Sequence, residues 1–328
     1  MKAAVVTRYG PPDVVKIGEA PKPTPEAGEV LIRVHATTVN RTDYGELRPG
    51  LLRIFFGLRR PKRLIFGMDF AGEIEALGAG VTSFKPGDRV FGMAPSRRNG
   101  AHAEFVCVPE AGAIATMPAS LRFDEAVVCE GAFYGDSGLR EFKVGPGHKT
   151  MIYGASGAIG SAAVQLAKAY GAEVTAVVPT RHLALAKSLG ADRVIDYTAE
   201  DFTKIGERFD YILDAVGKTT FVRCRRLLKP GGVFVMTDFG PWCANLPFWL
   251  WSAISGNKRV VVPLPKRGSG HAFVEFLKGR MQAGQFRAVI DRTYPLDAIA
   301  DAYRHVATKQ KAGIVVINIM PAAESAQA

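Results

Sequence analysis

The feature that most constrains the fold is a glycine-rich turn set between an apolar segment and a helix-like pattern. Thr150–Lys168 has the sequence TMIYGASGAIGSAAVQLAK, in which Gly154, Gly157 and Gly160 show the spacing G-x-x-G-x-x-G. Apolar or aromatic residues then recur at helical spacing: Ile159, Ala163, Leu166 and Tyr170. A tight turn that opens a helix lets the backbone approach a pyrophosphate and offers it free N–H groups. The segment predicts a dinucleotide-binding turn, and the alternative is a glycine-rich turn without a ligand.

The chain after residue 149 alternates between short apolar segments and helical patterns. Strands are predicted at Thr150–Tyr153, Glu173–Val178, Arg193–Ile195, Tyr211–Asp214, Val233–Thr237 and Arg259–Val262. Helices are predicted at Glu125–Leu139, Ala158–Tyr170, Leu183–Leu189 and Phe221–Leu228, and, nearer the C-terminus, at His271–Ala283 and Asp297–Thr308, before a closing strand at Ile314–Ile319. Such alternation predicts an α/β fold with a doubly wound parallel sheet.

The first third of the chain has a different pattern, with short strands and turns rich in glycine and proline. Strands are predicted at Met1–Val6, Glu29–Ala36, Phe70–Ala79, Arg89–Met93 and Ala103–Val108. In Glu29–Ala36, Val30, Ile32 and Val34 share one face. This region predicts a compact β-barrel.

Length and composition fit a globular protein of one large or two ordinary domains. The chain has 328 residues, of which 48% are hydrophobic and 22% charged. The most apolar segment, Trp242–Ile254, is shorter than a membrane span and contains Asn245 and Pro247, so we expect a buried or interfacial helix. The start of the chain does not resemble a signal peptide.

The four cysteines are widely spaced, which favours reduced thiols in the cytoplasm and argues against a structural zinc site.

The net charge is +11, which fits either a solvated basic surface or an anionic partner such as a phosphorylated cofactor. We expect no nucleic-acid partner, because the chain shows neither a helix packed with lysine and arginine nor an aromatic RNA-binding motif. The densest basic patch, Arg48–Arg63, predicts a loop or short helix over a pocket, and the alternative is a surface for a partner or membrane.

The segment after the second predicted parallel strand indicates which nucleotide binds. Enzymes that prefer NAD carry an acidic residue there for the ribose 2′-hydroxyl. This chain has Thr180 and Arg181 instead, and both can bind a 2′-phosphate. We therefore predict NADPH, although both residues could also merely cap and solvate the next helix. Contacts are expected from residues at strand ends: Gly154, Ser156, Gly157, Ala158, Ile159, Gly160, Thr180, Arg181, Tyr197, Val216, Gly217, Phe239 and Gly240.

Several motifs together resemble the medium-chain dehydrogenase/reductase superfamily, especially its zinc-independent branch of quinone oxidoreductases and zeta-crystallin-like proteins. The motifs span about residues 1–319: Lys2–Val15, Val39–Asp43, Gly67–Gly72, Pro86–Val90, the glycine turn, Leu189–Asp192 and Val194–Tyr197. The resemblance implies a GroES-like catalytic domain at 1–122, completed by 271–328, and a Rossmann domain at 123–270. It also implies a homodimer.

The resemblance also addresses zinc and the catalytic residues. Zinc-dependent members have a Cys-His pair where this chain has Asn40-Arg41, and a His where it has Met68, so we expect no metal. Cys129 and Glu130 lie near the third ligand position of the family. The catalytic candidates are Asn40, Asp43, Tyr44 and Tyr134. The alternative for each is a structural hydrogen bond or core packing, and CEGAFYGD departs from the usual family sequence.

These features predict a zinc-independent, NADPH-dependent oxidoreductase that transfers hydride to a quinone, an enone or a related carbonyl acceptor. The alternatives are a regulatory or structural protein that binds NADPH with little turnover, and an alcohol dehydrogenase of the same superfamily. We expect an apolar acceptor pocket between the domains, with walls from Leu51–Phe56, Phe133–Tyr134 and Phe239–Trp251. The alternative is that these aromatic residues only fill the core.

Overall fold

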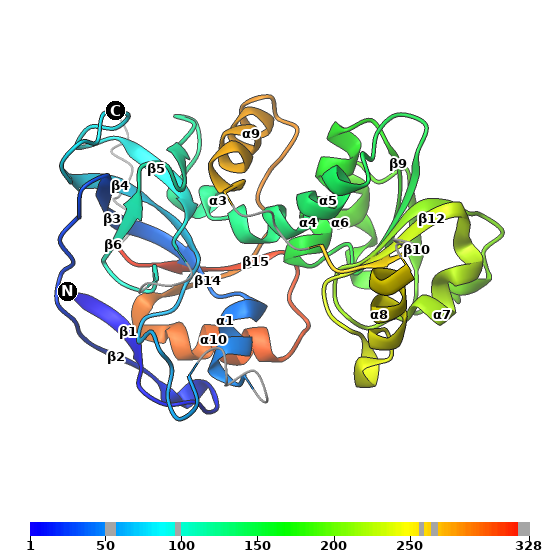
Figure 1. Ribbon diagram of the computed structural model, residues 1–328, viewed down its shortest axis with the longest axis horizontal. Helices are drawn as coiled ribbons and strands as arrows, with labels where there is room; N and C mark the ends of the chain where they lie inside the picture. Colours follow the sequence, from blue (N-terminus) through cyan, green and yellow to red (C-terminus); the bar gives the residue numbers. More distant parts are fainter. Residues whose placement is uncertain (50–56, 96–99, 256–258, 264–267, 321–328) are drawn as a thin grey trace. The chain divides into compact units, whose positions relative to one another are not determined.

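The computed structural model describes residues 1–49, 57–95, 100–255, 259–263 and 268–320. The chain divides into two compact units (Figure 1). The terminal unit contains Met1–Glu130, Arg267–Gln282 and Arg287–Ala328. The central unit contains Gly131–Lys266 and Ala283–Phe286.

The terminal unit is built on a mostly antiparallel seven-stranded sheet. Its strands are β3 (Glu29–Thr38), β4 (Asp69–Leu77), β5 (Arg89–Met93), β6 (Phe105–Pro109), β7 (Ala113–Thr116), β14 (Ile290–Pro295) and β15 (Ile314–Asn318). The order is β14-β15-β3-β4-β5-β7, with β6 also paired to β3. Among the described strand pairs of this sheet, β14 and β15 run parallel and the others antiparallel. A separate hairpin of β1 (Lys2–Val6) and β2 (Val15–Glu19) pairs Lys2 with Glu19.

Two of the hydrophobic clusters in the described part of this unit are large. Val30, Ile32 and Val34 of β3 pack against Phe70 and Ile74 of β4, as their alternation predicts. The second cluster joins β15 and the hairpin to helix α10, whose buried face carries Ile299, Ala302, Tyr303 and Val306. The helices in the described part of this unit are α1 (Arg41–Leu47), α3 (Phe123–Ala126), α9 (Gly270–Gln282) and α10 (Ile299–Ala307), with 3₁₀ turns η1 (Pro12–Val14) and η7 (Leu296–Ala298).

The central unit contains a six-stranded parallel sheet, which confirms the doubly wound prediction. Its strands are β8 (Lys149–Tyr153), β9 (Glu173–Val178), β10 (Arg193–Asp196), β11 (Phe209–Asp214), β12 (Leu228–Met236) and β13 (Val260–Val261). The order is β10-β9-β8-β11-β12-β13, with the reversal at the neighbours β8 and β11. In such sheets, ligands bind beyond the carboxyl ends of the strands at the point of reversal.

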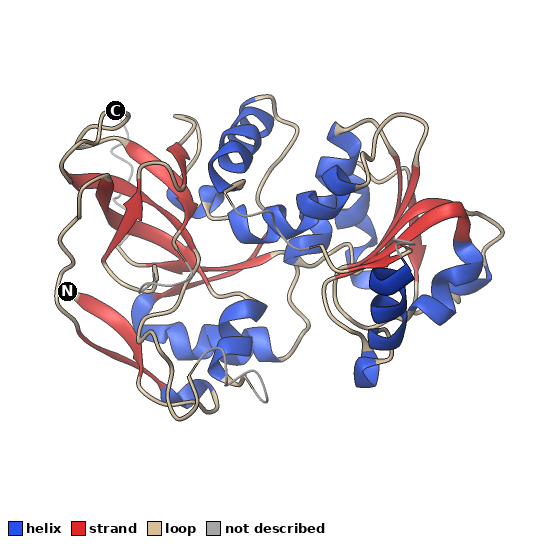
Figure 2. Ribbon diagram, viewed as in Figure 1, coloured by secondary structure: helices blue, strands red, loops and turns tan. Residues whose placement is uncertain are grey.

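Helices cover both faces of this sheet (Figure 2). They are α4 (Cys129–Glu141), which begins in the terminal unit, α5 (Ala158–Ala169), α6 (Leu183–Ser188), α7 (Phe221–Cys224) and α8 (Leu246–Ser255). The 3₁₀ turns are η3 (Thr180–His182), η4 (Phe202–Lys204), η5 (Arg225–Leu227) and η6 (Pro241–Cys243). The face that carries Met151, Ile212 and Phe234 packs on η4 and α7, and Phe248 and Trp249 of α8 cover the same cluster.

Some predicted elements differ from the structure. The single helix predicted over Glu125–Leu139 is wrong, because α3 ends at Ala126 and α4 begins at Cys129. Val127, with ψ of 63°, and Val128 separate them; β-branched side chains fit a helix less well, and both are buried. The buried or interfacial helix predicted in Trp242–Ile254 begins only at Leu246 and ends at Ser255; Ile254 is 85% exposed, so the interfacial alternative stays a prediction. Strands β2, β7 and β14 and helix α1 were not predicted.

Candidate functional site

The sequence-predicted nucleotide contacts follow the carboxyl ends of five parallel strands. Asp214 pairs in register with Tyr153 and with Met236, and Asp196 pairs with Val178. The ends of β8, β9, β10, β11 and β12 are therefore on one edge of the sheet. The structure brings the predicted residues at 154–160, 180–181, 197, 216–217 and 239–240 to this edge.

The glycine turn joins β8 to α5, and its backbone is packed closely against the start of the helix. Gly154 has φ of +79°, a left-handed conformation that glycine adopts readily. A Cβ on Gly160 would lie 2.2 Å from the carbonyl oxygen of Gly154, so only glycine lets the helix start so close to the turn. Gly157 is the N-cap of α5, and the first helical N–H groups have no partner within the helix. These groups and the helix dipole suit a pyrophosphate, so the turn fits a bound dinucleotide.

The loop after β11 is organised by the Asp214 carboxylate. Its Oδ1 accepts the N–H groups of Val216 at 3.1 Å and Gly217 at 2.9 Å, and its Oδ2 accepts that of Thr219 at 2.9 Å. Burial raises the pKa of this carboxyl, and the backbone N–H groups oppose that rise. Asp214 thus shapes the loop in which Val216 and Gly217 were predicted to contact the nucleotide.

The loop after β9 has a hydrogen-bond network that sequence reasoning did not foresee. The Thr180 hydroxyl donates to Oδ2 of Asp196 at 2.6 Å and lies 2.8 Å from the Thr198 hydroxyl. Its role as a phosphate ligand stays a prediction, since this hydroxyl is already engaged. Arg181 is exposed, and its Nε donates to His182 Nε2 at 3.2 Å.

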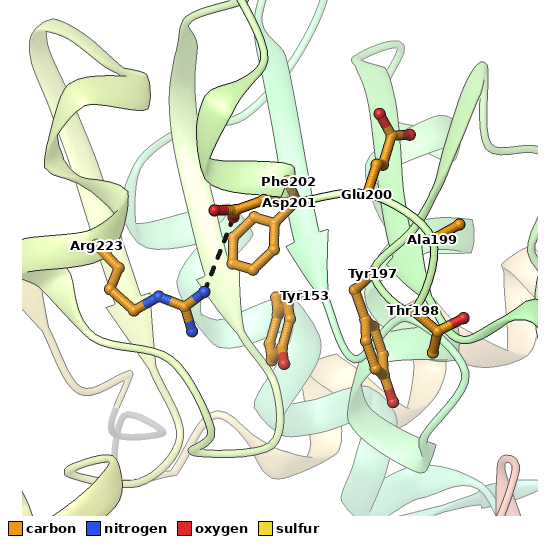
Figure 3. Close-up of a pocket in the computed structure, with 8 residues that line it drawn as sticks. All are labelled: Tyr153, Tyr197, Thr198, Ala199, Glu200, Asp201, Phe202 and Arg223. Carbon is orange, nitrogen blue, oxygen red and sulfur yellow. Dashed lines mark ion pairs between the residues drawn. The ribbon is translucent and has the colours of Figure 1, made fainter.

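A cavity of 460 Å³ opens beside the ends of β8 and β10 (Figure 3). The rings of Tyr153 and Tyr197 lie 5.9 Å apart, and Phe202 lies 5.0 Å from Tyr153. Arg223 stands over the Phe202 ring at 5.4 Å and forms an ion pair with Asp201 at 3.9 Å. Flat aromatic walls suit a heteroaromatic ring. Glu200 and Asp201 also line the cavity, and Arg223 is already paired with Asp201, so the lining disfavours an anionic group.

Of the residues around this cavity, sequence reasoning identified only Tyr197. Thr198 follows the same strand end, so the rule that selected Tyr197 could also have found it. Arg223 belongs to α7, and no pattern in the sequence connects it to residues near 200. Tyr153 is the last residue of a buried strand, where a tyrosine looks like ordinary core.

A buried network of hydrogen-bonded polar side chains surrounds Asn40 in the terminal unit. The Asn40 side-chain amide donates to Oγ1 of Thr38 at 2.8 Å, to Oε2 of Glu130 at 2.6 Å and to Oδ2 of Asp69 at 3.4 Å. Thr42 donates its hydroxyl to Oε1 of Glu130. We call Asp43, Asp69 and Glu130 the carboxyl cluster; all three are buried.

The environment of the carboxyl cluster favours the protonated forms of two of its members. Burial raises the pKa of Asp69 to about 6, although the backbone N–H of Glu130 and the Thr38 hydroxyl oppose the rise. Burial, together with the charges of Asp43 and Asp69, raises the pKa of Glu130 to about 8. Buried carboxyl groups with raised pKa values are candidates for acid–base chemistry.

The other catalytic candidates stay predictions, and the structure gives them different surroundings. Asp43 accepts two backbone N–H groups, from Asn40 at 2.8 Å and Gly67 at 3.0 Å, which is a structural arrangement. Tyr44 is half-buried and packs against the core of the terminal unit, with Arg48 3.5 Å from its hydroxyl. Tyr134 is half-buried on α4 in the central unit.

The residues at the family's zinc positions do not fit a zinc ion. The Asn40 side-chain nitrogen donates to Thr38 and Glu130, and as an amide nitrogen it has no lone pair free for a metal because that pair is delocalised into the carbonyl. Met68 supplies a thioether, which is not among the usual zinc ligands. Within the described part of the chain, no three His, Cys, Asp or Glu side chains gather in a metal-binding group.

The residues proposed for the acceptor pocket fall in three different settings. Leu51–Phe56 lies outside the described residues. Phe133 and Tyr134 are on α4. Trp249 packs at 5.6 Å from Phe239 and covers the sheet core, which favours the core-filling alternative for this pair. The pocket itself stays a prediction.

Over the described ranges, the structure contains no helix long and apolar enough to cross a membrane.

Comparison with known proteins identifies relatives over nearly the full length. Residues 26–119 match the alcohol dehydrogenase GroES-like domain, and residues 189–317 match the zinc-binding dehydrogenase family. The chain is 31% identical to the mitochondrial NAD(P)H oxidoreductase RTN4IP1 of Danio rerio, covering 98% of this chain and 92% of the relative. It is 30% identical to a chloroplastic NADPH-dependent alkenal/one oxidoreductase of Arabidopsis thaliana, covering 98% and 80%. The solved quinone oxidoreductase from Coxiella burnetii has a TM-score of 0.86 at 26% identity, with 98% and 99% covered.

Proposed function

Because the chain belongs to the medium-chain dehydrogenase/reductase superfamily, among its quinone-oxidoreductase-like NAD(P)H-dependent members, we propose that it reduces a quinone, an enone or a related carbonyl acceptor with NADPH and without zinc. The observation that carries the proposal is the position of Asn40, where zinc-dependent members of the superfamily have a ligand. Its amide donates hydrogen bonds within a buried polar group.

The nucleotide would lie along the carboxyl edge of the parallel sheet. The first N–H groups of α5 hold its pyrophosphate, and the loops after β9 and β10 hold its adenosine half. The cavity beside Tyr153 and Tyr197 offers aromatic surfaces for this half of the molecule. When bound, the nicotinamide supplies the hydride, and the chain binds and orients the reactants. NADPH is favoured over NADH because Thr180 and Arg181 stand where an acidic residue would select NAD.

The proposed acceptor class rests on the expectation that no zinc is bound, because Asn40 and Met68 stand at the family's ligand positions. Without a metal to stabilise an alkoxide, oxidation of a simple alcohol has no electrostatic support in the carboxyl cluster. An activated double bond or a quinone accepts hydride more readily, because the resulting charge is delocalised. The plant relative named as an alkenal/one oxidoreductase and the quinone oxidoreductase from Coxiella burnetii support this choice.

The proposed function is tested by nucleotide consumption with a panel of acceptors. Purified protein should consume NADPH steadily with quinones and enals, more slowly with NADH, and should not oxidise simple alcohols with NADP⁺. Tight NADPH binding without turnover over the whole panel would support the regulatory alternative instead. Alcohol oxidation as the fastest reaction would support an alcohol dehydrogenase.

Zinc is expected to be neither bound nor required. Elemental analysis of the purified protein should find well under one zinc per chain, because Asn40 and Met68 supply no ligand atoms of the usual kind. Treatment with a chelator should leave acceptor reduction unchanged. One zinc per chain, with activity lost on chelation and regained with zinc, would refute this part of the proposal.

A homodimer is expected through the end of the parallel sheet. Strand β13 pairs with β12 and is the last strand in the order of the described sheet, so its outer edge suits a symmetric copy. Trp251 and Ile254 of α8 are 55% and 85% exposed and add apolar area near this edge. Light scattering at micromolar concentration should give twice the mass of one chain, and Trp251→Lys should shift the mass toward the monomer. A wild-type monomer would contradict the expectation.

Three further points belong to the proposal. We keep the domain boundaries that the sequence predicts, at 122/123 and 270/271, with 271–328 completing the catalytic domain. The acceptor pocket is apolar. The protein is cytoplasmic, although named relatives include mitochondrial and chloroplastic proteins.

A further inference from the structure

The Asp196 carboxylate is held at the end of β10 by uncharged donors. Its Oδ2 accepts the Thr180 hydroxyl at 2.6 Å, and its Oδ1 accepts the N–H of Thr198 at 2.9 Å and the Thr198 hydroxyl at 2.6 Å. In the described part of the chain, no cationic side chain forms an ion pair with it. The carboxylate is therefore fixed in position, and its negative charge is not neutralised by a neighbour.

This carboxylate lies where a parallel nucleotide-binding sheet distinguishes the two nucleotides. The distinction is made at the end of the second strand, which is β9 in this chain. Asp196 pairs in register with Val178 of β9, and the N–H of Tyr197 donates to the Val178 carbonyl at 3.1 Å. The two strands end together, so Asp196 reaches Thr180, the second residue after β9. The sequence of β9 has no acid at this end, but the structure supplies one from β10.

Asp196 also fixes the direction of the Thr180 hydroxyl. A hydroxyl has one proton to donate, and a carboxylate has none, so the Thr180 proton points to Asp196 across their 2.6 Å contact. The Thr198 hydroxyl, 2.8 Å from that of Thr180, gives its own proton to the same carboxylate. The Thr180 oxygen can then only accept hydrogen bonds from a ligand. A ribose 2′-hydroxyl can donate one, whereas a 2′-phosphate carries acceptor oxygens and negative charge.

Arg181 has the opposite preference at the same strand end. Its guanidinium is exposed and can pair with a phosphate, while its Nε donates to His182 Nε2 at 3.2 Å. Within the described ranges, Arg181 forms no ion pair with Asp196. The positive and the negative charge are therefore both available to a nucleotide, and they act in opposite senses on the 2′-phosphate.

We propose that Asp196 is a specificity-determining residue that allows NADH to bind and limits the preference for NADPH; this rests on the nucleotide site of the proposed function. The 2′-hydroxyl of NADH donates to the Thr180 oxygen, whose own proton is held by Asp196. The 2′-phosphate of NADPH binds Arg181 against the repulsion of Asp196. The protein uses both nucleotides, and its preference for NADPH is the difference between these two contributions.

The first test removes the charge of Asp196 and keeps its shape. Asp196→Asn should tighten NADPH binding about fivefold, because a neutral amide does not repel the phosphate. The same variant should weaken NADH binding about threefold, because the new amide can donate to the Thr180 oxygen and compete with the 2′-hydroxyl. Fluorescence titration with each nucleotide gives the dissociation constants, and the unfolding temperature reports whether the variant is folded.

Glu173→Gln is the matched control for the loss of one negative charge. Glu173 is the first residue of β9, so it lies at the amino edge of the sheet, and its ion pair with Lys149 is on the surface. Its dissociation constants for both nucleotides should stay within about twofold of wild type. The proposal is refuted if Asp196→Asn binds NADPH no more tightly than wild type, or if Glu173→Gln tightens NADPH binding equally.

The second test examines the 2′ position with probes that carry no nicotinamide. ADP and 2′-deoxy-ADP differ only in the 2′-hydroxyl, and wild type should bind ADP about fivefold more tightly. Thr180→Val should bind the two probes equally, because it has no oxygen to accept the hydroxyl. Thr180→Ser should restore the difference. Equal affinities of wild type for the two probes would overturn the proposal.

These binding measurements separate the role of Asp196 from the proposed function. If the dissociation constants change as expected but wild type reduces no acceptor, the proposed function fails and the role of Asp196 stands. If wild type reduces acceptors with NADPH, and either binds no NADH or has constants that Asp196→Asn leaves unchanged, the role of Asp196 fails and the proposed function stands. A wild type that binds neither nucleotide refutes both.

Discussion

Gly160→Ala is expected to destabilise the central unit by about 1–3 kcal/mol and to weaken nucleotide binding strongly, because it overfills the tightest contact of the glycine turn. The added Cβ would lie 2.2 Å from the carbonyl oxygen of Gly154 and 2.8 Å from the Cα of Ala155. Both are backbone atoms, so no side chain can rotate away. The turn must open or the helix must move back, and either change displaces the N–H groups meant for the pyrophosphate.

Gly157→Ala is the matched control for this prediction. Gly157 has φ of −77°, which alanine adopts without strain, and its nearest neighbour would be the carbonyl oxygen of Gly154 at 3.6 Å. Urea unfolding and fluorescence titration with NADPH should show a much larger loss of stability for Gly160→Ala than for Gly157→Ala. Equal stabilities for the two variants would mean that the turn is not packed as the structure describes.

The sequence predicted the parts of the fold that depend on neighbouring residues. The glycine turn, its preceding strand and the helix after it form one local pattern, so Gly154 and Gly160 could be interpreted without any tertiary information. The alternating strands of the central unit followed from the same periodicity. Helices α3 and α4 follow one another closely and share one helical pattern of apolar residues. The periodicity therefore does not show the break between them at Val127 and Val128.

The buried polar groups could not be predicted in the same way. Asn40, Asp69 and Glu130 are far apart in the chain, and only the packing of α1, β4 and the start of α4 brings them together. A single sequence contains no signal that these three side chains are in contact. Glu130 was visible only as a neighbour of a family ligand position, and its partner Thr42 was not singled out at all.

The Thr180 hydroxyl shows the same limit at the nucleotide site. Its sequence position predicts a phosphate contact, whereas the structure bonds it to Asp196 across the strand ends. An exposed aspartate is ionised at neutral pH, and this hydrogen bond lowers the pKa of Asp196 further. A 2′-phosphate near an ionised carboxylate needs a cation to offset the repulsion. We therefore expect Arg181, more than Thr180, to determine the preference for NADPH over NADH.

Arg181→Ala should weaken NADPH binding by roughly ten- to a hundredfold and leave NADH binding nearly unchanged. The guanidinium is exposed, and its Nε donates to the imidazole of His182 at 3.2 Å, a bond that a phosphate could replace. A hydrogen bond to a charged group contributes about 1.5–3 kcal/mol, and this range corresponds to the stated change in dissociation constant. NADH lacks the 2′-phosphate, so the same substitution removes nothing from its site.

Arg208→Ala is the control for the loss of one positive charge. Arg208 is also exposed, but it precedes β11 and therefore lies at the amino edge of the parallel sheet, away from the strand ends that hold the nucleotide. Titration of both variants with both nucleotides should show a large effect only for Arg181→Ala with NADPH. If Arg208→Ala weakens NADPH equally, the preference comes from the overall +11 charge. If Arg181→Ala weakens NADH as much as NADPH, the side chain holds a group common to both nucleotides and does not select the phosphate.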